Sequence, residues 1–599
     1  MIGLLRNYFF VVVTLIALLS GSFVPAALAN VYFHSHEADE TGQGTLEQRG
    51  HAEQEVSWRD EHLGSRASWV RFKILGFNDF HGQLSSGKKV GGRPVGSAPV
   101  LAAYLDAAAS QSENGAFIVH AGDQVGASPP VSALLQDEPS ITFLNMLAND
   151  QCRYGHRMRP GCNLVGTLGN HEFDEGVTEM LRLINGGMHA QGLFLDANYR
   201  GARFPYVCAN VVDARTGHTL LPPYVIKRVR GIPVAFIGAV LKETPSIVTP
   251  SGVSGVRFLD EADAINSYIP ELKAHGVHAI IVTIHQGTYA SAYTGPTHST
   301  PQDLAGAIGD IVARLDDEVD IVISGHAHGF TNALVANRHG KQILVTQAFS
   351  AGTAYDDIDV AIDPVSRDIV EKSASIVTTW ADAGAGLNPD TRVAQLVTQA
   401  EARVAPLVNR VIGVATADIL KTENSAGESA LGNLIADAQR MATGSDFAFM
   451  NPGGIRADIS LGEVTWGALF SVQPFNNDLV RLELNGDQIK TLLNQQWAGQ
   501  PYARLLKVSG LTYVWDNARP VGDRITEMRT AAGLPIEANA VYTVTVNSFL
   551  AAGGDNFSVL TQGANPVVGP VDLDALVKYI GGLAQPFNYV TEGRIQRLN

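Results

Sequence analysis

Cysteine is scarce in this chain, with three residues in 599. They are Cys152, Cys162 and Cys208, and no Cys-x-x-Cys spacing occurs, so a zinc site built from cysteine thiolates is unsupported. An oxidising compartment makes a disulfide possible, and Cys152 with Cys162, which are separated by a short segment, is the favoured pair. Cys208 is then left over, and we expect a buried free thiol there, within YVCANVV.

Positive charge is also in deficit. Lys and Arg total 43 against 59 for Asp and Glu, which gives a formal net charge of −16. This balance argues against a general affinity for nucleic-acid polymers or anionic membranes, because both are bound by positive surfaces. If the protein handles phosphate groups, we expect it to do so at one local site.

Long apolar runs are missing everywhere except near the N-terminus. Residues 8–19 (YFFVVVTLIALL) follow Arg6, and Ala27–Ala29 fits the small-x-small rule for signal cleavage. Because the run is short against the roughly 20 residues of a membrane-spanning helix, we interpret residues 1–29 as a cleaved secretory signal in preference to an uncleaved anchor. No later segment is long and apolar enough to cross a bilayer. We therefore expect an exported protein: periplasmic, secreted or at the cell surface.

Internal repeats and low-complexity tracts are absent too, and 45% hydrophobic with 17% charged residues is an ordinary globular balance. At 599 residues the chain is too long for one hydrophobic core. After a polar, flexible leader at 30–70, short apolar runs alternate with amphipathic stretches through 71–365, which predicts an α/β layered domain. A second domain of mixed strands and helices is expected at 410–599.

The linker between the domains, residues 366–409, is expected to contain a helix at 388–409. Asn388 is a suitable N-cap, with Pro389 at the first helical position. Apolar residues follow at helical spacing, and we expect this stripe to be packed in a core.

Five of the apolar runs in the first domain end in side chains that can bind metals. They are Asp79 and His81 after FKILGF, Asp123 after AFIVH, Asn170, His171 and Asp174 after NLVGTLG, His285 at the end of HAIIVTIH, and His326 and His328 after DIVISG. In open α/β sheets, ligands bind beyond the carboxyl ends of the strands. The five segments together therefore predict one metal centre.

Each residue alone has an ordinary structural interpretation, such as a hydrogen-bonded histidine for His285 or a helix cap for Asn170. That interpretation requires five coincidences within one domain, and we discard it. By contrast, His34 and His36 lie in the polar leader with no strand to position them, and we expect a solvated tail there.

The order of these residues, Asp-x-His, Gly-Asp, Gly-Asn-His-Glu, His and Gly-His-x-His, resembles the pattern of the calcineurin-like metallophosphoesterases. The second domain resembles the nucleotide-recognition domain that follows it in secreted 5'-nucleotidases. That likeness lies in LGNLIADA (431–438), NPGGIRAD (451–458), QPFNNDLV (473–480) and NSFLAAGGDNF (547–557). The resemblance runs from about residue 71 to the C-terminus and implies an active site formed between the domains.

The resemblance implies two divalent metal ions. Asp79, His81 and His328 would hold one, Asn170, His285 and His326 would hold the other, and Asp123 would bridge them. Imidazole and carboxylate without thiolate suit zinc, manganese or iron. Two ions about 3.5–4 Å apart polarise phosphoryl oxygens and activate water for in-line attack on phosphorus. The two histidines of SGHAHG are then divided between the ions.

Two neighbours of Asn170 take a separate role in this family. His171 would stabilise the charged transition state or protonate the leaving oxygen, and Asp174 would orient the imidazole. The alternative for Asp174 is a carboxylate in the first turn of a helix, favoured by the helix dipole.

In the second domain, the resemblance implies a nucleoside stacked between Phe475 and Phe549, since every base has a π face. Asp555 would accept hydrogen bonds from the ribose hydroxyls, Asn451 would contact the base, and Arg456 would approach the phosphate.

One position departs from the family pattern. Relatives typically carry an arginine a few residues before LGNL, whereas this chain has Ser425 near that place and Lys421 further upstream. Because a lysine does not reproduce the bidentate grip of a guanidinium, Arg456 is left as the main cation from this domain.

Together these expectations describe an exported two-domain bimetal phosphohydrolase that acts on nucleotides, with a 5'-nucleotidase as the first choice. A 2',3'-cyclic-nucleotide phosphodiesterase with 3'-nucleotidase activity, or a UDP-sugar hydrolase, would use the same metals and similar base stacking. The non-enzyme alternative is a nucleotide-binding protein with an inactive metal site, and the complete ligand set speaks against it.

Overall fold

Two stacked β-sheets organise the N-terminal part of the protein. The computed structural model describes residues 69–192, 194–288, 296–297, 304 and 306–599. The expected signal at 1–29 and nearly all of the polar leader, with His34 and His36, lie outside the described residues.

The first sheet has the strand order β15-β14-β1-β4-β5. Its strands are β1 (Val70–Phe77), β4 (Ala116–His120), β5 (Leu164–Gly166), β14 (Ala354–Ile362) and β15 (Ile369–Thr378). β1, β4 and β5 run parallel to one another, whereas β14 and β15 pair antiparallel. The parallel strands therefore end at the same edge of this sheet.

The second sheet has the order β12-β13-β11-β10-β8-β7. Its strands are β7 (Tyr224–Val229), β8 (Ile232–Val240), β10 (Ala279–His285), β11 (Val319–Ile323), β12 (Phe330–Ala336) and β13 (Gln342–Ala348). β8, β10, β11 and β13 are parallel, so this sheet too presents several carboxyl ends at one edge.

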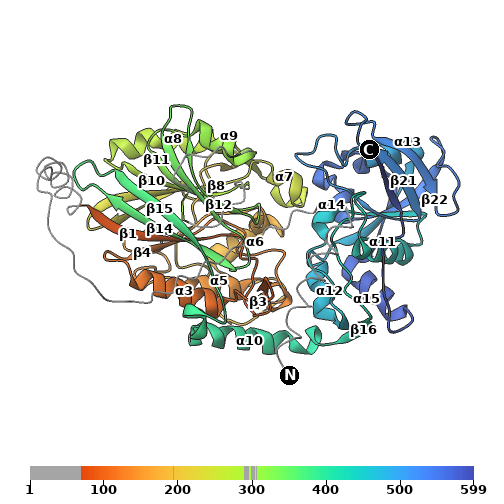
Figure 1. Ribbon diagram of the computed structural model, residues 1–599, viewed down its shortest axis with the longest axis horizontal. Helices are drawn as coiled ribbons and strands as arrows, with labels where there is room; N and C mark the ends of the chain where they lie inside the picture. The colour runs from red at the N-terminus through yellow and green to blue at the C-terminus, as the bar shows by residue number, and fades with distance from the viewer. Residues whose placement is uncertain (1–68, 193, 289–295, 298–303, 305) are drawn as a thin grey trace, which may run out of the picture. The chain divides into compact units, whose positions relative to one another are not determined.

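Alternating side chains build the layers on both faces of the first sheet. Ile74 of β1 packs in the core between the two sheets, together with Phe117, Phe236 and Ile281, whereas the next residue, Leu75, packs in the core on the outer face. The outer core contains α3 (Ala98–Ser110), α5 (Glu138–Leu147) and α6 (Gly176–Asn185). Helices α8 (Glu261–Ala274) and α9 (Ala307–Arg314) cover the second sheet (Figure 1). The expected layered α/β sandwich is confirmed.

The first domain extends further than the expected boundary near residue 365. β15 begins at Ile369 and pairs along β14, so it completes the first sheet from within the expected linker. The boundary was placed too early because the local sequence pattern of β15 does not specify that it pairs with β14.

The helix of the linker is α10 (Thr391–Val408), which starts later than expected. Its N-cap is Asp390, whose side chain accepts hydrogen bonds from the backbone N–H groups of Arg392 and Val393. Asn388 and Pro389 therefore stay outside the helix, because the carboxylate of Asp390 satisfies the free donors of the first turn. The expected apolar stripe is buried at Val393, Val397, Ala400 and Val404, in the same core as α3 and α5.

The C-terminal part is a mixed α/β arrangement with a five-stranded sheet ordered β20-β17-β23-β19-β24. The strands of this part are β16 (Val411–Ala415), β17 (Phe447–Met450), β18 (Gly462–Thr465), β19 (Asp478–Asn485), β20 (Lys507–Ser509), β21 (Leu511–Asp516), β22 (Ile525–Thr530), β23 (Val541–Asn547), β24 (Ala564–Val571) and β25 (Ile595–Leu598). Its helices are α11 (Ala430–Thr443), α12 (Trp466–Val472), α13 (Gly486–Asn494), α14 (Ser548–Ala551) and α15 (Asp572–Gly582). α11, α12 and α15 share one core, and the sheet packs in another.

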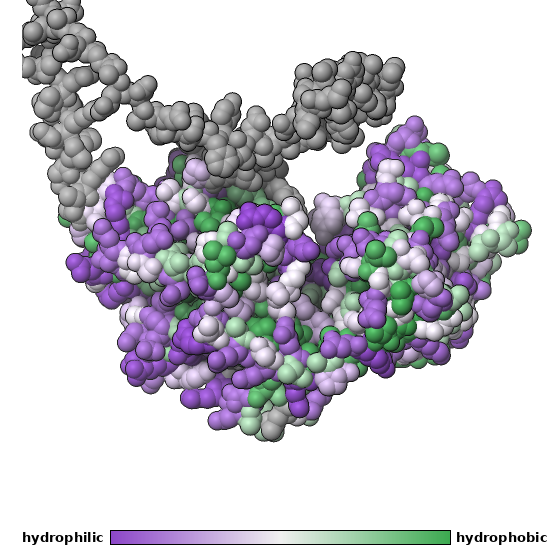
Figure 2. Space-filling view, turned by 60° about the horizontal axis from the view of Figure 1, so that its bottom comes forward, coloured by the Kyte–Doolittle hydropathy of each residue, from purple (hydrophilic) through white to green (hydrophobic). Residues whose placement is uncertain are grey.

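Short elements complete the chain. They are β2 (Lys89–Val90), β3 (Arg93–Pro94), α4 (Pro130–Ala133), β6 (Val211–Asp213), α7 (Thr244–Ile247) and β9 (Val256–Phe258). Cys152 and Cys162, the favoured pair, form a disulfide, and Cys208 is a buried free thiol. On the face shown in Figure 2, hydrophobic residues are interspersed with hydrophilic ones. In the ranges that the structure describes, no helix is long and apolar enough to span a membrane.

Candidate active site

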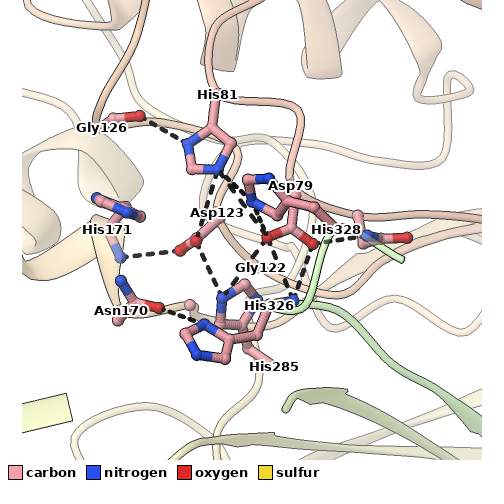
Figure 3. A network of polar contacts seen from close by, with 12 residues as sticks. Asp79, His81, Gly122, Asp123, Gly126, Asn170, His171, His285, His326 and His328 are labelled. Carbon is pink, nitrogen blue, oxygen red and sulfur yellow. Dashed lines mark hydrogen bonds and ion pairs between the residues drawn. The ribbon is translucent and has the colours of Figure 1, made fainter. Parts of the chain in front are cut away.

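The expected metal-binding residues follow directly on strand ends of both sheets. In the first sheet β1 ends at Phe77, β4 at His120 and β5 at Gly166, while in the second β10 ends at His285 and β11 at Ile323. Figure 3 shows the side chains that follow these strands converging on one point. The centre therefore lies where the carboxyl ends of the two sheets meet.

Two groups of side chains are distinguished within this centre. Ligand atoms of Asp79, His81 and His328 lie within 4.8 Å of one another, and so do those of Asp123, His285 and His326. His328 Nε2 lies 3.1 Å from Asp79 Oδ1, and His326 Nδ1 lies 3.0 Å from Asn170 Oδ1. The two histidines of SGHAHG thus belong to different groups. A third combination, His81, Asp123 and His171, satisfies the same distance limit, although we did not expect His171 to be a ligand.

The tautomers of two histidines favour a cation in the centre. His81 Nδ1 lies 2.8 Å from the carbonyl oxygen of Gly126, and His285 Nδ1 lies 2.7 Å from that of Ala121. Each Nδ1 must carry a proton and donate it, so in the neutral ring each Nε2 directs a lone pair into the centre. The buried Nε2 of His285 lies 3.0 Å from Asp123 Oδ2. Such lone pairs beside carboxylates fit a divalent metal.

The charge of the centre points the same way. Burial alone would raise the pKa of Asp79, but the adjacent His328 and His285 lower it to about 2. Burial would lower the pKa of His285, yet Asp123 and Asp79 raise it to about 10. The buried carboxylates therefore demand positive charge among them, whether it comes from protons or from metal ions. The pKa of His326 is lowered to about 4 by burial, which keeps this imidazole neutral.

Five of the seven expected ligands have left-handed backbone conformations. They are Asp79 (φ +50°), His81 (+48°), Asp123 (+51°), His326 (+71°) and His328 (+53°). Positive φ is uncommon for residues other than glycine and concentrates at functional sites. Each of these strands is thus followed by a sharp turn that directs the side chain into the centre.

Glu172 supports the centre without belonging to either group of candidate ligands, and no role is predicted for it from the sequence. Its buried carboxylate accepts hydrogen bonds from the backbone N–H groups of Asp123 (2.9 Å), Gln124 (2.9 Å) and Gly169 (2.5 Å). It thereby ties the turn after β4 to the turn after β5. Its position in the Gly-Asn-His-Glu motif is the sequence feature from which this supporting role could have been predicted.

His171 and Asp174 form a hydrogen-bonded pair beside the centre. His171 Nδ1 lies 2.7 Å from Asp174 Oδ2. Burial lowers the pKa of His171, but the negative charges of Asp174 and Asp123 outweigh this and raise it. The ring of Phe475 stacks against the imidazole, with 5.9 Å between the centroids. The pair therefore lies between the metal-binding cluster and the aromatic side chains of the C-terminal part.

A cavity of about 440 Å³ opens next to this pair. It is lined by Asn170, His171, Asp174 and His326 and by all five expected substrate residues, Asn451, Arg456, Phe475, Phe549 and Asp555. Asp555 is buried and accepts a hydrogen bond from Asn451 Nδ2 at 2.8 Å. Burial raises the pKa of Asp555. Both groups of residues singled out in the sequence thus face one cavity.

Tyr502 and Arg504 also line this cavity, and no role is predicted for either of them from the sequence. Arg504 is buried, and its Nη1 lies 3.4 Å from Asp555 Oδ1. Nothing in their local sequence, QPYARLL, distinguishes them from an ordinary loop. Ser425, which stands near the expected arginine position, is exposed and does not line this cavity.

Comparison with known proteins supports this organisation. The family described as "Calcineurin-like phosphoesterase" matches residues 72–330, and "5'-nucleotidase, C-terminal domain" matches residues 411–562. The chain is similar to the endonuclease YhcR of Bacillus subtilis (38% identity; 88% of this chain, 41% of that protein). It is also similar to the cell wall protein Lmo0130 of Listeria monocytogenes (34%; 86% and 67%).

Among solved structures, a 5'-nucleotidase precursor from Thermus thermophilus superposes with a TM-score of 0.72 at 28% identity, covering 88% of this chain and 100% of that one. The chain thus spans less than half of YhcR but the full length of the solved 5'-nucleotidase precursor. These matches agree with the order of the motifs along the sequence. The chain belongs to the calcineurin-like phosphoesterases that carry a 5'-nucleotidase C-terminal domain, a family of metal-dependent hydrolases.

Proposed function

We propose that the protein is an exported 5'-nucleotidase, which removes the phosphate of nucleoside 5'-monophosphates at a centre of two divalent cations. The observation that carries this proposal is the composition of one cavity. His171, Asn170 and His326 line it together with Phe475 and Phe549. A ligand in this cavity could contact aromatic rings and the edge of the metal-binding cluster at once.

The cations would be held by the two groups of side chains in the cluster. Asp79, His81 and His328 would bind one, Asn170, His285 and His326 would bind the other, and Asp123 would bind both. When bound, two such cations polarise the phosphoryl oxygens and lower the pKa of water. The ligand set without thiolate suits zinc, manganese or iron.

The nucleoside would be held by the C-terminal part. Phe475 and Phe549 offer ring faces for stacking, which is worth about 1–3 kcal/mol per base. The carboxylate of Asp555 would accept hydrogen bonds from the ribose hydroxyls, and Asn451, which already donates to it, would contact the base. Arg456 lies 5.9 Å above the ring of Phe475, from where its guanidinium would approach the phosphate.

His171 would supply the proton for the leaving oxygen. Asp174 holds its Nδ1, so Nε2 is the ring nitrogen left to donate. The raised pKa favours the protonated form of the imidazole, which is the form that an acid in this position requires. Asp174 acts by fixing the orientation and the charge of that ring.

Two observations support export. The disulfide between Cys152 and Cys162 is a feature of oxidising compartments. A relative with 34% identity bears the name of a cell wall protein.

The test is phosphate release from a panel of nucleotides, after metal stripping and re-addition. The panel contains 5'-, 3'- and 2',3'-cyclic nucleotides, UDP-glucose and, because one relative is named an endonuclease, a single-stranded oligonucleotide. We expect the highest kcat/KM for a 5'-monophosphate. This activity should be lost on metal stripping and restored when a transition metal is added back. A higher kcat/KM for the cyclic nucleotide or UDP-glucose would replace this proposal with the corresponding alternative. The net charge of −16 opposes activity on the polymer.

A further inference from the structure

A buried ion pair forms part of the wall of the cavity that contains Phe475 and Phe549. Its members, Arg504 and Asp555, both line this cavity, and each is only 7% exposed. Arg504 Nη1 lies 3.4 Å from Asp555 Oδ1. Among the residues that the structure describes, no other lysine, arginine or histidine nitrogen lies within 4.0 Å of this carboxylate. Arg504 is therefore the cation that offsets the charge of Asp555.

The second oxygen of Asp555 has a neutral partner. Asn451 Nδ2 donates a hydrogen bond to Asp555 Oδ2 at 2.8 Å, and Asn547 Nδ2 donates to Asn451 Oδ1 at 3.1 Å. An ionised carboxylate has about four lone-pair sites for hydrogen bonds. One contact at each oxygen therefore leaves about half of this capacity free in the cavity, which matches the two hydroxyl groups of a ribose.

Gln500 connects the guanidinium to the backbone that carries the carboxylate. Arg504 Nη1 donates to Gln500 Oε1 at 2.9 Å, and Gln500 Nε2 donates to the backbone oxygen of Asp555 at 2.6 Å. Asp555 has a left-handed backbone conformation, with φ at +55°, which is uncommon for a residue other than glycine. The ion pair and Gln500 together fix both the side chain and the backbone of Asp555.

The charge of Arg504 also decides the chemical form of Asp555. Burial raises the pKa of this carboxyl group, while Arg504 and Asn451 act in the opposite direction. Without the cation, the protonated form would gain population. A protonated carboxyl group has one O–H donor and accepts fewer hydrogen bonds than a carboxylate. Arg504 thus favours the form that can accept from two hydroxyl groups at once.

We propose that Arg504 is a positioning residue for ribose recognition, which holds the Asp555 carboxylate in the charge and orientation that accept hydrogen bonds from the ribose hydroxyls. This inference rests on the proposed function for the identity of the substrate. Arg504 acts through Asp555 and not on the phosphate. It therefore determines how strongly the protein prefers a ribonucleotide over a nucleotide that lacks both hydroxyls.

The test compares the hydrolysis of adenosine 5'-monophosphate (AMP) with that of its 2',3'-dideoxy analogue, which keeps the base and the phosphate. We expect Arg504→Gln to raise KM for AMP about tenfold, the effect of weakening one charge-assisted interaction. KM for the dideoxy analogue should change little, because this analogue has no hydroxyl to donate to Asp555. Arg504→Lys keeps a cation and should lie between the wild type and Arg504→Gln. The kcat for AMP should be retained in both variants.

A pH profile separates this role from a purely structural one. Removal of the guanidinium should raise the pKa of Asp555 further, because burial is then opposed by Asn451 alone among the groups that now lower it. In Arg504→Gln the preference for AMP should therefore fall at low pH and partly return as the pH rises. In the wild type the same fall should begin at a lower pH.

A double variant tests the route through Asp555. Asp555→Asn should itself reduce the preference for AMP, and adding Arg504→Gln to it should reduce this preference no further. Arg519→Gln is the matched control, because Arg519 is exposed, pairs with Asp523 and does not line the cavity. It should behave like the wild type.

Two results would overturn the inference while the proposed function stands. The first is an equal rise of KM for AMP and for the dideoxy analogue in Arg504→Gln, which would indicate a contact with the base or the phosphate, or a general loss of structure. The second is the same loss of preference in Arg519→Gln. A wild type that releases phosphate from neither substrate would instead refute the proposed function, and this inference with it.

Discussion

At the scale of single residues, the centre depends on where each strand stops. His326 and His328 are separated by one residue, and in a straight strand their side chains would share a face. Both have positive φ, so the chain turns at each, and the two imidazoles join different groups. The sequence predicts this division through the glycine before His326, while the partners of each imidazole emerge only from the assembled sheets.

The division makes a prediction about metal content. His326→Ala and His328→Ala should each remove about one equivalent of bound metal per chain, because in the proposed arrangement each change deletes one ligand of a different cation. Elemental analysis after dialysis against limiting metal measures the loss. Spectroscopy of a cobalt-substituted sample should show different spectra for the two variants. Loss of both equivalents in either variant, or of none, would contradict separate sites.

His120 makes a second prediction at this scale, for stability against pH. This residue is buried at the end of β4, and neither ring nitrogen has a hydrogen-bond partner among the described residues. Burial lowers its pKa to about 3 from an ordinary value near 6.5. Below pH 6.5 the unfolded chain therefore binds a proton at this histidine, whereas the folded protein does so only near pH 3. The free energy of unfolding consequently decreases as the pH falls from 6.5 towards 3.

His120→Leu should remove this loss. Between about pH 6 and pH 4 the variant should lose less stability than the wild type, with a difference on the order of 1 kcal/mol per pH unit. Urea unfolding at several pH values gives the comparison. The exposed His218, changed to Leu, is the control and should follow the wild type. Parallel pH profiles for His120→Leu and the wild type would refute the argument.

At the scale of elements, the sequence predicts strands better than it predicts boundaries. The apolar runs that end in Asp79, Asp123 and His285 lie on β1, β4 and β10, since continuous burial is a local property of each run. The start of α10 was wrong by a few residues, because Asn388 and Asp390 are both acceptable caps and only the folded chain shows which one accepts the backbone hydrogen bonds. β15 falls within the expected linker because its pairing with β14 is a tertiary contact.

The cap of α10 is testable. Asp390→Ala should lower the free energy of unfolding by about 1 kcal/mol, since two backbone donors lose their acceptor. Asp390→Ser should retain most of the stability, because a hydroxyl also caps. Asn388→Ala, changed at the position first expected to be the cap, should be close to neutral. Denaturant titration measures the free energy of unfolding of each variant. A larger decrease in Asn388→Ala than in Asp390→Ala would show that Asn388, and not Asp390, is the N-cap.

At the scale of the whole molecule, the motifs predict which residues meet but not what surrounds them. The family pattern identifies Phe475, Phe549 and Asp555, and the folded chain lines one cavity with all three. Tyr502 and Arg504 carry no local signal, because the folded chain places them in the cavity beside residues far away in the sequence. The substrate side of the centre is therefore less predictable than its metal side.

Metal removal tests the centre at this scale. Without cations, Asp79 and Asp123 are buried anions, so chelation should destabilise the whole N-terminal part. At a metal concentration of about 100 times Kd, one site contributes about 2.7 kcal/mol to stability. Thermal unfolding with a chelator, and then with excess metal, should show a lower and a restored Tm. The Tm of Asp123→Asn should change less than that of the wild type under the same treatment. A wild-type Tm that does not change would argue against resident cations.

The positions of the ligands along the chain set an order of events in biogenesis. The expected ligands run from residue 79 to residue 328, and they come from strands of both sheets. A ribosome has to complete β11 and the turn after it before the last histidine is available. Until then, the carboxylates of the first strands have no full set of partners. The complete set of proposed ligands therefore exists only in a nearly finished fold, so a metal that requires all of them would enter late.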